Sequence, residues 1–294
     1  REEADDLLDE LIYRFSDPPA PVVGLVDVAL LRNQAANLGV GEITQREDIL
    51  VGRNAVSEAL RSGRTIDKVF AASGDTDHGL RRLCSQAKQA GAVISMTDRR
   101  KLDQMAAGGA HQGIIAYAAA HTYATVDEIL QRAADQGRTP LLVICDEIVD
   151  PHNLGAILRT AECAGACGVI IPKRRSVGLT AVVAKTSAGA IEYLPVARVT
   201  NIAATVDKLK QQGVWVCGTA ADGATALYDA DLTGPTAIVI GNEGHGISRL
   251  VAERCDYLLS IPMLGQISSL NASAAAAILL YEAVRQRSSG AANQ

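Results

Sequence analysis

Short apolar runs alternate with longer amphipathic stretches through the second half of the chain. Runs of four or five apolar residues are typical of buried strands, and apolar residues at every third or fourth position are typical of helices. The pattern predicts strands at 141–145, 168–171, 193–196, 214–217, 237–240 and 257–261, and helices near 154–165, 181–187, 202–211, 248–254 and 270–287. Such alternation predicts a mostly parallel sheet covered on both faces, with a ligand outside the carboxyl ends of its strands.

The same pattern predicts a separate, smaller α/β domain over residues 49–118. Its elements are a strand that turns into a helix over 50–60, strands at 67–71, 92–95 and 111–117, and helices at 79–90 and 98–105. Residues 119–139, with a helix at 126–134 and the breaker Gly137, are expected to link it to a second domain over 140–288, which starts at a second breaker, Pro140. Residues 289–294 are expected to form a tail.

Residues 1–48 differ from the rest in charge. They hold 11 acidic and 4 basic side chains, a net of −7, whereas the remaining 22 acidic and 24 basic side chains give a net of +2. One short amphipathic helix is predicted at residues 1–16. The segment is expected to be an acidic leader that is either disordered or an addition to the natural chain. Because the body is mildly basic, the overall charge of −5 does not exclude a nucleic-acid partner.

The composition is that of a compact α/β protein, with 48% hydrophobic but only 3% aromatic residues. No apolar run reaches the length of a membrane span, and no signal peptide precedes the first domain, so a cytoplasmic protein with no membrane association is expected. The six cysteines include no C-x-x-C pair and lie mostly in apolar patterns. They are expected to be reduced, buried thiols, and no metal site is predicted.

Three loops of similar build follow predicted strands, at residues 150–159, 240–248 and 261–273. Each combines glycine, polar side chains and the start of a helix, whose first N–H groups have no partner within the helix. In the loop that starts at Gly241 the glycines have the order G-x-x-G-x-G, which does not match the dinucleotide fingerprint, and no phosphate-binding P-loop is present. Since all three loops fall at carboxyl ends of strands, the sequence predicts one ligand site at that edge of the sheet.

Arg159 lies six residues after Asn153 on the first of these helices. Asn153 is expected to cap the helix, and Gly155 to leave open space beside the Arg159 guanidinium. Taken alone, a surface arginine paired with Glu162 is the more common interpretation. At a strand's carboxyl end, however, an arginine beside open space is what phosphate recognition requires.

The three loops, read as Asn153-Leu-Gly-x3-Arg159, Ile240-Gly-Asn-Glu-Gly244 and Ile261-Pro-Met-x5-Ser269-Leu-Asn271, resemble in order and spacing the motifs of the SpoU (TrmH) group of SPOUT RNA 2′-O-methyltransferases. Within that group the RlmB-type enzymes, which methylate a guanosine ribose in 23S rRNA, are most similar. The resemblance covers about residues 49–287. The segments 51–56 and 111–116 resemble the family's N-terminal RNA-binding domain of L30e/L7Ae type.

The resemblance implies a C-terminal trefoil knot, a homodimer with its site near the subunit interface, and S-adenosyl-L-methionine (SAM) as cofactor. Small residues such as Ala272 and Ala276 suit a helix that threads through a loop, because such a helix must pack closely. The cofactor-binding residues implied by the family are Thr219, Gly241, Asn242, Ile261, Met263 and Leu270.

The family's catalytic residues correspond here to Asn153, Arg159, Glu243, Ser269 and Asn271, and its RNA-binding segment to Arg53 and Asn54. The family assigns proton removal to Arg159, but a guanidinium stays protonated in proteins. We therefore favour a role in which Arg159 holds a neighbouring phosphate and stabilises the developing alkoxide. The resemblance implies 2′-O-methylation of a ribose in large-subunit rRNA. A tRNA ribose methyltransferase and a resistance-type or catalytically idle RNA-binding protein remain as alternatives.

Overall fold

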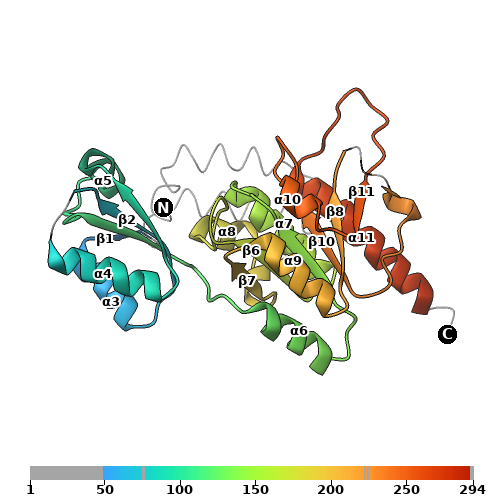
Figure 1. Cartoon of the computed structure of the whole chain (residues 1–294), viewed down its shortest axis with the longest axis horizontal. Coiled ribbons are helices and arrows are strands. Elements are labelled where there is room, and N and C mark those ends of the chain that lie inside the picture. Colours follow the sequence, from blue (N-terminus) through green and yellow to red (C-terminus); the bar gives the residue numbers. More distant parts are fainter. Residues whose placement is uncertain (1–48, 75–76, 222, 224, 292–294) are drawn as a thin grey trace, which may run out of the picture. The chain divides into compact units, whose positions relative to one another are not determined.

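The computed structural model describes residues 49–74, 77–221, 223 and 225–291, which build two separate β-sheets (Figure 1). The first sheet has four strands in the order β1-β4-β2-β3 and the second has seven in the order β7-β6-β5-β10-β8-β11-β9. Residues 1–48 lie outside the described residues, and so does the helix predicted at 1–16. The predicted α/β class with a C-terminal parallel sheet is confirmed.

The first sheet is mixed. Its strand β2 pairs with β3 in parallel and with β4 in antiparallel orientation, and β4 pairs with β1 antiparallel. The elements around it are β1 (Ile49–Val51), α3 (Arg53–Arg61), β2 (Ile66–Ala72), α4 (His78–Gln89), β3 (Val93–Thr97), α5 (Arg99–Ala106) and β4 (Ile114–Ala118).

Alternating side chains of β4 serve opposite faces of this sheet, as the period of two in a strand requires. Ile114 packs with Val56 of α3 and Leu80 of α4, whereas Ile115 packs with Leu102 of α5. Helices α3 and α4 therefore cover one face and α5 covers the other, so the small α/β domain that the sequence predicts has three layers.

The second sheet is parallel throughout the described residues. Its strands are β5 (Leu141–Cys145), β6 (Gly168–Pro172), β7 (Val196–Val199), β8 (Trp215–Thr219), β9 (Thr225–Ala226), β10 (Thr236–Ile240) and β11 (Tyr257–Ser260). Its helices are α6 (Val126–Asp135), α7 (Pro151–Cys163), α8 (Ala181–Thr186), α9 (Ile202–Gln211), α10 (Arg249–Ala252) and α11 (Ala272–Ala291), with 3-10 turns η1 (Ala190–Glu192) and η2 (Leu227–Asp229).

Strand β5 is buried along its whole length, which explains its uninterrupted apolar sequence. Val143 packs with α7 and α11 on one face, and Ile144 packs with α6 and α9 on the other. Helix α6 lies inside the predicted linker 119–139, yet its Val126 and Ile129 belong to the core of the second sheet. The domain boundaries themselves stay a prediction.

The strand predicted at 193–196 is wrong by three residues. Tyr193 ends the 3-10 turn η1 and its side chain is exposed, and the strand β7 starts only at Val196. Pro195 lies between them, and a proline has no N–H to donate to a sheet ladder. Strand β9 was not predicted because two residues are too few to show a period.

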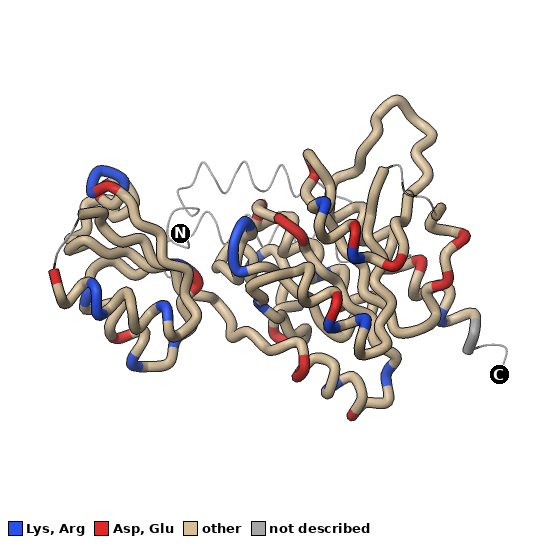
Figure 2. Tube along the Cα trace, viewed as in Figure 1, with Lys and Arg blue, Asp and Glu red and all other residues tan. Residues whose placement is uncertain are grey.

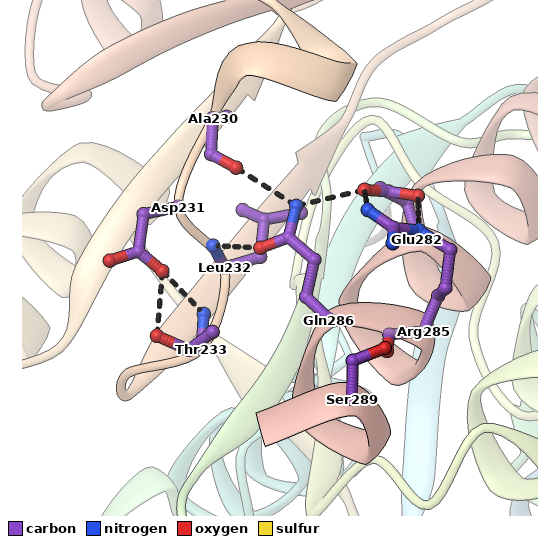
Figure 3. A network of polar contacts seen from close by, with 8 residues as sticks. All are labelled: Ala230, Asp231, Leu232, Thr233, Glu282, Arg285, Gln286 and Ser289. Carbon is purple, nitrogen blue, oxygen red and sulfur yellow. Dashed lines mark hydrogen bonds and ion pairs between the residues drawn. The ribbon is translucent and has the colours of Figure 1, made fainter. Parts of the chain in front are cut away.

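The last helix is anchored near its C-terminus by polar contacts with the segment that precedes β10 (Figure 3). Gln286 donates from Nε2 to Ala230 O (2.9 Å) and accepts at Oε1 from Leu232 N (2.8 Å). Arg285 donates two hydrogen bonds to the Glu282 carboxylate, at 2.8 and 2.7 Å. These bonds, together with one from Gln286, lower the pKa of Glu282 to about 2, so this carboxylate stays charged at neutral pH.

Arg287 continues this anchor with four hydrogen bonds to backbone carbonyls. It donates to Leu232 O (3.0 Å), Gly234 O (2.6 Å), Thr139 O (3.1 Å) and Pro140 O (3.0 Å). The side chain thus joins the end of α11 to the residues that lead into β5 and to those that lead into β10.

None of the helices between residues 49 and 291 that the structure describes is both long and apolar enough to cross a membrane. Within the same described residues, no group of three or more His, Cys, Asp or Glu side chains is arranged to hold a metal ion.

Candidate active site

The three polar loops meet at the carboxyl edge of the second sheet. Strands β5 and β10 are parallel neighbours, and β8 lies between β10 and β11, so the loops that follow β5, β10 and β11 leave the same edge. The single site that the sequence predicts at this edge is therefore geometrically possible.

A cavity of about 620 Å³ opens between the loops that follow β8, β10 and β11. Its walls combine apolar side chains such as Ile240, Leu258 and Leu259 with the backbone of residues 241–246. The six residues expected to bind the cofactor all line it: Thr219, Gly241, Asn242, Ile261, Met263 and Leu270. The structure thus brings together residues that are up to 51 positions apart in the sequence.

Gly241 lies where two stretches of backbone approach most closely. A Cβ at this position would be 2.2 Å from both Gly246 C and Ile247 N. Asn242 N donates to Gly246 O (2.9 Å) and Gly246 N donates to Asn242 O (2.8 Å), which closes the loop on itself. Only glycine fits at residue 241 unless this loop, which forms one wall of the cavity, shifts.

The cavity fits S-adenosylmethionine in size and in chemistry. Pockets for ligands of this size have volumes of about 300–1,000 Å³, and apolar walls with a few fixed polar groups are their usual lining. The apolar side chains suit the adenine ring, and the backbone of the exposed residues 243–245 suits its polar edge and the ribose. The Thr219 hydroxyl hydrogen is not available to a ligand, because Thr219 Oγ1 donates it to Val239 O at 3.0 Å.

One hydrogen-bonded group beside the cavity joins Asn153, in the first turn of α7, to Glu243 and Asn271, which lie on two loops. Asn153 Nδ2 donates to Glu243 Oε1 (2.9 Å), and Asn271 Nδ2 donates to Asn153 Oδ1 (2.9 Å) and to Glu243 Oε1. Ala272 N also lies 3.4 Å from Glu243 Oε1 at the start of α11. The contacts span up to 118 residues of sequence, so the fold itself assembles this group.

The expected capping role of Asn153 is wrong. The N-cap of α7 is Asp150, whose side chain accepts from His152 N (2.9 Å), and Pro151 takes the first helical position, where its missing N–H costs nothing. Asn153 lies inside the first turn and is only 8% exposed. Its side chain is therefore free to contact Glu243 and Asn271.

The expected open space beside Gly155 is also wrong. A Cβ at this glycine would lie 1.8 Å from Thr186 Oγ1 of α8. Gly155 therefore permits α7 and α8 to pack closely, and it leaves no gap for a ligand.

Two expected catalytic residues remain outside the hydrogen-bonded group. Ser269 is exposed and lines the cavity. Arg159 is exposed on α7 and makes no hydrogen bond or ion pair with the part of the chain that the structure describes. The alternative in which Arg159 pairs with Glu162 is therefore not found, and the guanidinium is available to a ligand.

The sequence pattern did not reveal the roles of Asp146 and Glu147, which follow β5 directly. Asp146 Oδ2 accepts from Ser248 N (2.7 Å). Glu147 O accepts from Asn242 Nδ2 (3.2 Å), and its Oε2 lies 3.1 Å from His245 Nε2. His245, for which the sequence indicates no role, thus helps to hold the glycine-rich loop in place. The sequence signal that could have indicated these roles is the pair of acidic residues, Asp146 and Glu147, directly after a predicted strand.

Glu147 also forms an ion pair with Arg175: Arg175 NH1 lies 3.1 Å from Glu147 Oε1. Hydrogen bonds from His245 and Arg175 lower the pKa of the Glu147 carboxyl below its usual range. The backbone of Glu147 has φ = 60°, a left-handed conformation that is uncommon for a residue other than glycine. Such conformations cost about 1–3 kcal/mol and cluster at functional sites.

In the first domain, Arg53 and Asn54 stand at the start of α3 after Gly52, which has φ = 90°. Arg53 is engaged within the domain: Nε donates to Gln112 O (3.0 Å) and NH1 lies 3.0 Å from Asp77 Oδ2. Asn54 is exposed, with no hydrogen bond to the described residues. Both residues line two neighbouring hollows on this domain, of about 640 and 610 Å³.

Comparison with known families identifies both halves of the chain. The SpoU rRNA Methylase family matches residues 140–281, and a family described as RNA 2′-O ribose methyltransferase substrate binding matches residues 49–124. A TRCF domain model matches residues 1–61, so it overlaps the substrate-binding match at residues 49–61.

Individual relatives agree with these matches. A putative TrmH family tRNA/rRNA methyltransferase of Bacillus subtilis, YacO, is 46% identical over 245 residues, which cover 83% of this chain and 98% of the relative. One of Staphylococcus haemolyticus is 48% identical over 242 residues, with 82% and 97% covered. The crystal structure of the SpoU methyltransferase AviRb of Streptomyces viridochromogenes, in complex with AdoMet, superposes with a TM-score of 0.53 at 27% identity, covering 89% of this chain and 100% of that one. The chain belongs to the SpoU/TrmH family of RNA methyltransferases, and its cofactor is S-adenosylmethionine.

Proposed function

We propose that this protein transfers the methyl group of S-adenosylmethionine to the ribose 2′-oxygen of a guanosine in 23S rRNA. The observation that carries the proposal is the Asn153–Glu243–Asn271 group at the edge of the cavity that fits the cofactor. The match of the first domain to a substrate-binding family for 2′-O ribose methyltransferases supports the choice of the ribose oxygen.

The cofactor supplies a methyl group on a positively charged sulfur. A ribose hydroxyl that attacks it must lose its proton, and the developing alkoxide needs a hydrogen-bond donor or a positive charge nearby. Glu243 Oε1 accepts from the side-chain amides of Asn153 and Asn271 and from Ala272 N, whereas Oε2 has no partner among the described residues. Glu243 Oε2 accepts the hydrogen bond from the ribose hydroxyl and takes up its proton as the 2′-oxygen attacks the methyl group. Asn153 and Asn271 orient the carboxylate, and Ser269 positions the ribose.

Arg159 holds the phosphate next to the reacting ribose and stabilises the developing alkoxide. Its guanidinium is exposed and has no partner among the described residues, which supports this role, because the planar fork matches two phosphate oxygens. Within one chain Arg159 lies on a different face of α7 from Asn153, since six residues turn a helix by about 600°, which leaves the two side chains about 120° apart.

A homodimer explains this separation. If the α7 helix of a second copy packs against the cavity of the first, its Arg159 comes close to a cavity whose described lining contains no arginine. The loop between β11 and α11 also exposes Leu264 (99%) and Ile267 (74%), two large apolar side chains that suit a subunit contact.

The proposal includes the trefoil knot and the L30e/L7Ae type of the first domain. The close fit of α11 supports the knot, because Ala272 and Ala276 are 4% and 0% exposed in the core. The three-layered first domain, with its mixed four-stranded sheet, is compatible with an RNA-binding fold. A crystal structure that traces the backbone through residues 219–236 and 257–287 tests the threading directly.

The purified protein is expected to place 2′-O-methyl groups at one guanosine of unmodified 23S rRNA. The experiment incubates it with labelled S-adenosylmethionine and separately with 23S rRNA and with tRNA, and then maps the labelled nucleotides. The bacterial relatives are called tRNA/rRNA methyltransferases, so label in tRNA alone would replace the rRNA proposal by the tRNA alternative. Binding of RNA without transfer to either substrate would favour a catalytically idle protein.

The first domain selects the substrate through Arg53 and Asn54. A ribose hydroxyl carries no sequence information, so selection requires contacts to RNA elsewhere. The two hollows that meet at these residues offer a surface for such contacts.

Asn54→Ala is expected to weaken binding of 23S rRNA about threefold to tenfold, as loss of one good polar contact does, without a change in melting temperature. Arg53→Ala should weaken binding more, most strongly at low salt, and should also lower the melting temperature because it releases Asp77 and Gln112. Filter binding at two salt concentrations and thermal denaturation measure both effects. Gln89→Ala, an exposed amide on α4, is the matched control. Equal binding by Asn54→Ala and the control would remove Asn54 from the interface.

A further inference from the structure

Three consecutive basic residues follow strand β6, namely Lys173, Arg174 and Arg175, and form a continuous blue stretch in Figure 2. Strand β6 is a parallel neighbour of β5, and β5 of β10. The run therefore leaves the same edge of the sheet as the loops of the active site. Two strand spacings, about 10 Å, separate it from the loop that follows β10.

Polar contacts tie this basic run to the active-site loops. Arg175 NH1 lies 3.1 Å from Glu147 Oε1, and the other carboxylate oxygen of Glu147 lies 3.1 Å from His245. Ser176 Oγ and Val177 N both lie 2.9 Å from Ile148 O, to which they donate. The position of the run is thus fixed relative to the glycine-rich loop that carries Glu243.

The charge of the run is available to a partner. Arg175 is 81% exposed at its side chain although it binds Glu147. Arg174 is exposed, and within the described residues neither it nor Lys173 makes a side-chain hydrogen bond or ion pair. The Glu147 carboxylate is shared by Arg175 and His245, so its single charge does not neutralise the run.

The backbone of the run is held in an uncommon conformation. Arg175 has φ = 57°, and its ion-pair partner Glu147 has φ = 60°. Two left-handed residues other than glycine in direct contact cost free energy that the fold must offset. Such conformations cluster at functional sites.

We propose that Lys173, Arg174 and Arg175 form a phosphate-binding edge for the RNA strand whose ribose enters the cavity beside Glu243. This inference rests on the proposed function, because it takes the bound RNA strand to be the substrate for methylation. Contacts from arginine and lysine to phosphate position a nucleic acid without reading its sequence. Such an edge holds the strand next to the reacting nucleotide, while the first domain selects the RNA.

The test compares two full-length double variants that each lose two positive charges. Lys173→Ala with Arg174→Ala removes charge from the proposed edge. Lys208→Ala with Lys210→Ala removes it near the C-terminus of α9, which leads into the start of β8 and so lies at the opposite edge of the sheet. Anisotropy of a fluorescein-labelled, mixed-sequence 20-nucleotide RNA measures Kd between 50 and 300 mM KCl.

The edge variant is expected to bind this RNA about tenfold more weakly at 100 mM KCl, and its plot of log K against log salt should be shallower by about 1.4, the contribution of two phosphate contacts to a single strand. Calorimetry should show unchanged binding of S-adenosylmethionine, which confirms that the fold is intact. The control variant should differ from the wild type by less than about twofold. Equal Kd and equal salt dependence in the two variants would overturn the proposal.

The RNA-binding result can be interpreted separately from the test of the proposed function. If the wild-type protein failed to methylate rRNA, the anisotropy measurements would still decide whether the edge binds RNA. If the wild type methylated rRNA and the edge variant bound RNA normally, only the phosphate-binding edge would be wrong.

Discussion

Arg159→Lys is expected to lower the rate of RNA methylation by on the order of a hundredfold, while the affinity for S-adenosylmethionine barely changes. Lysine keeps the positive charge but lacks the planar fork that binds two phosphate oxygens. The guanidinium is exposed and has no partner in the described residues, so the substitution breaks no contact within the protein. Single-turnover methylation of 23S rRNA and calorimetry with the cofactor measure the two quantities.

Arg132→Lys, the same exchange on the outer helix α6, is the matched control for nonspecific effects of charge geometry. The control should retain the wild-type rate. If Arg159→Lys also turned over at that rate, Arg159 would be an ordinary surface residue and the phosphate role would be abandoned. A loss of cofactor affinity equal to the loss of rate would instead assign Arg159 to the cofactor site.

Gly241→Ala should weaken cofactor binding about ten- to a hundredfold. The added methyl group would lie 2.2 Å from backbone atoms of Gly246 and Ile247, so the loop must move as a whole. Overpacking of this kind costs about 1–3 kcal/mol, and each 1.4 kcal/mol is tenfold in Kd. Because this loop is one wall of the cavity, the cost appears in binding as well as in stability. Calorimetry and circular dichroism separate the two.

Gly265→Ala is the control for Gly241→Ala. Gly265 belongs to the loop between β11 and α11, and a Cβ there has no atom within 4 Å. This variant should bind the cofactor as the wild type does. Unchanged binding by Gly241→Ala would show that the loop adapts freely, and would remove Gly241 from the residues that shape the cavity.

Much of the site could be predicted from the sequence because each loop stands at the end of a strand that is apolar throughout. Parallel strands bring such ends to one edge, so the three loops were expected at one site, and the family resemblance implied Asn153, Glu243 and Asn271 within them. The predicted N-cap of α7 was wrong because neighbouring residues compete for that position. Asp150, three residues before Asn153, takes the cap of α7, and a helix has only one N-cap.

Other features could not be predicted because they depend on contacts between distant residues. Glu147 and His245 are 98 positions apart, and no local pattern records that their side chains meet. The close approach of Thr186 to Gly155 likewise depends on how two helices pack. A glycine in a helix is compatible with open space and with a tight contact alike, and only the packed structure distinguishes them.

The four carbonyls that Arg287 binds have a consequence for how such proteins diversify. Two of them belong to Thr139 and Pro140, where the chain enters the catalytic sheet, and Arg287 itself lies near the end of the last helix. One side chain therefore joins the start of the chain segment that builds this sheet to its last helix. A unit whose ends meet in this way tolerates exchange of whatever precedes it. Recombination can thus attach a different N-terminal module before α6, whose Val126 and Ile129 belong to the core of this sheet, and leave the chemistry of methyl transfer intact.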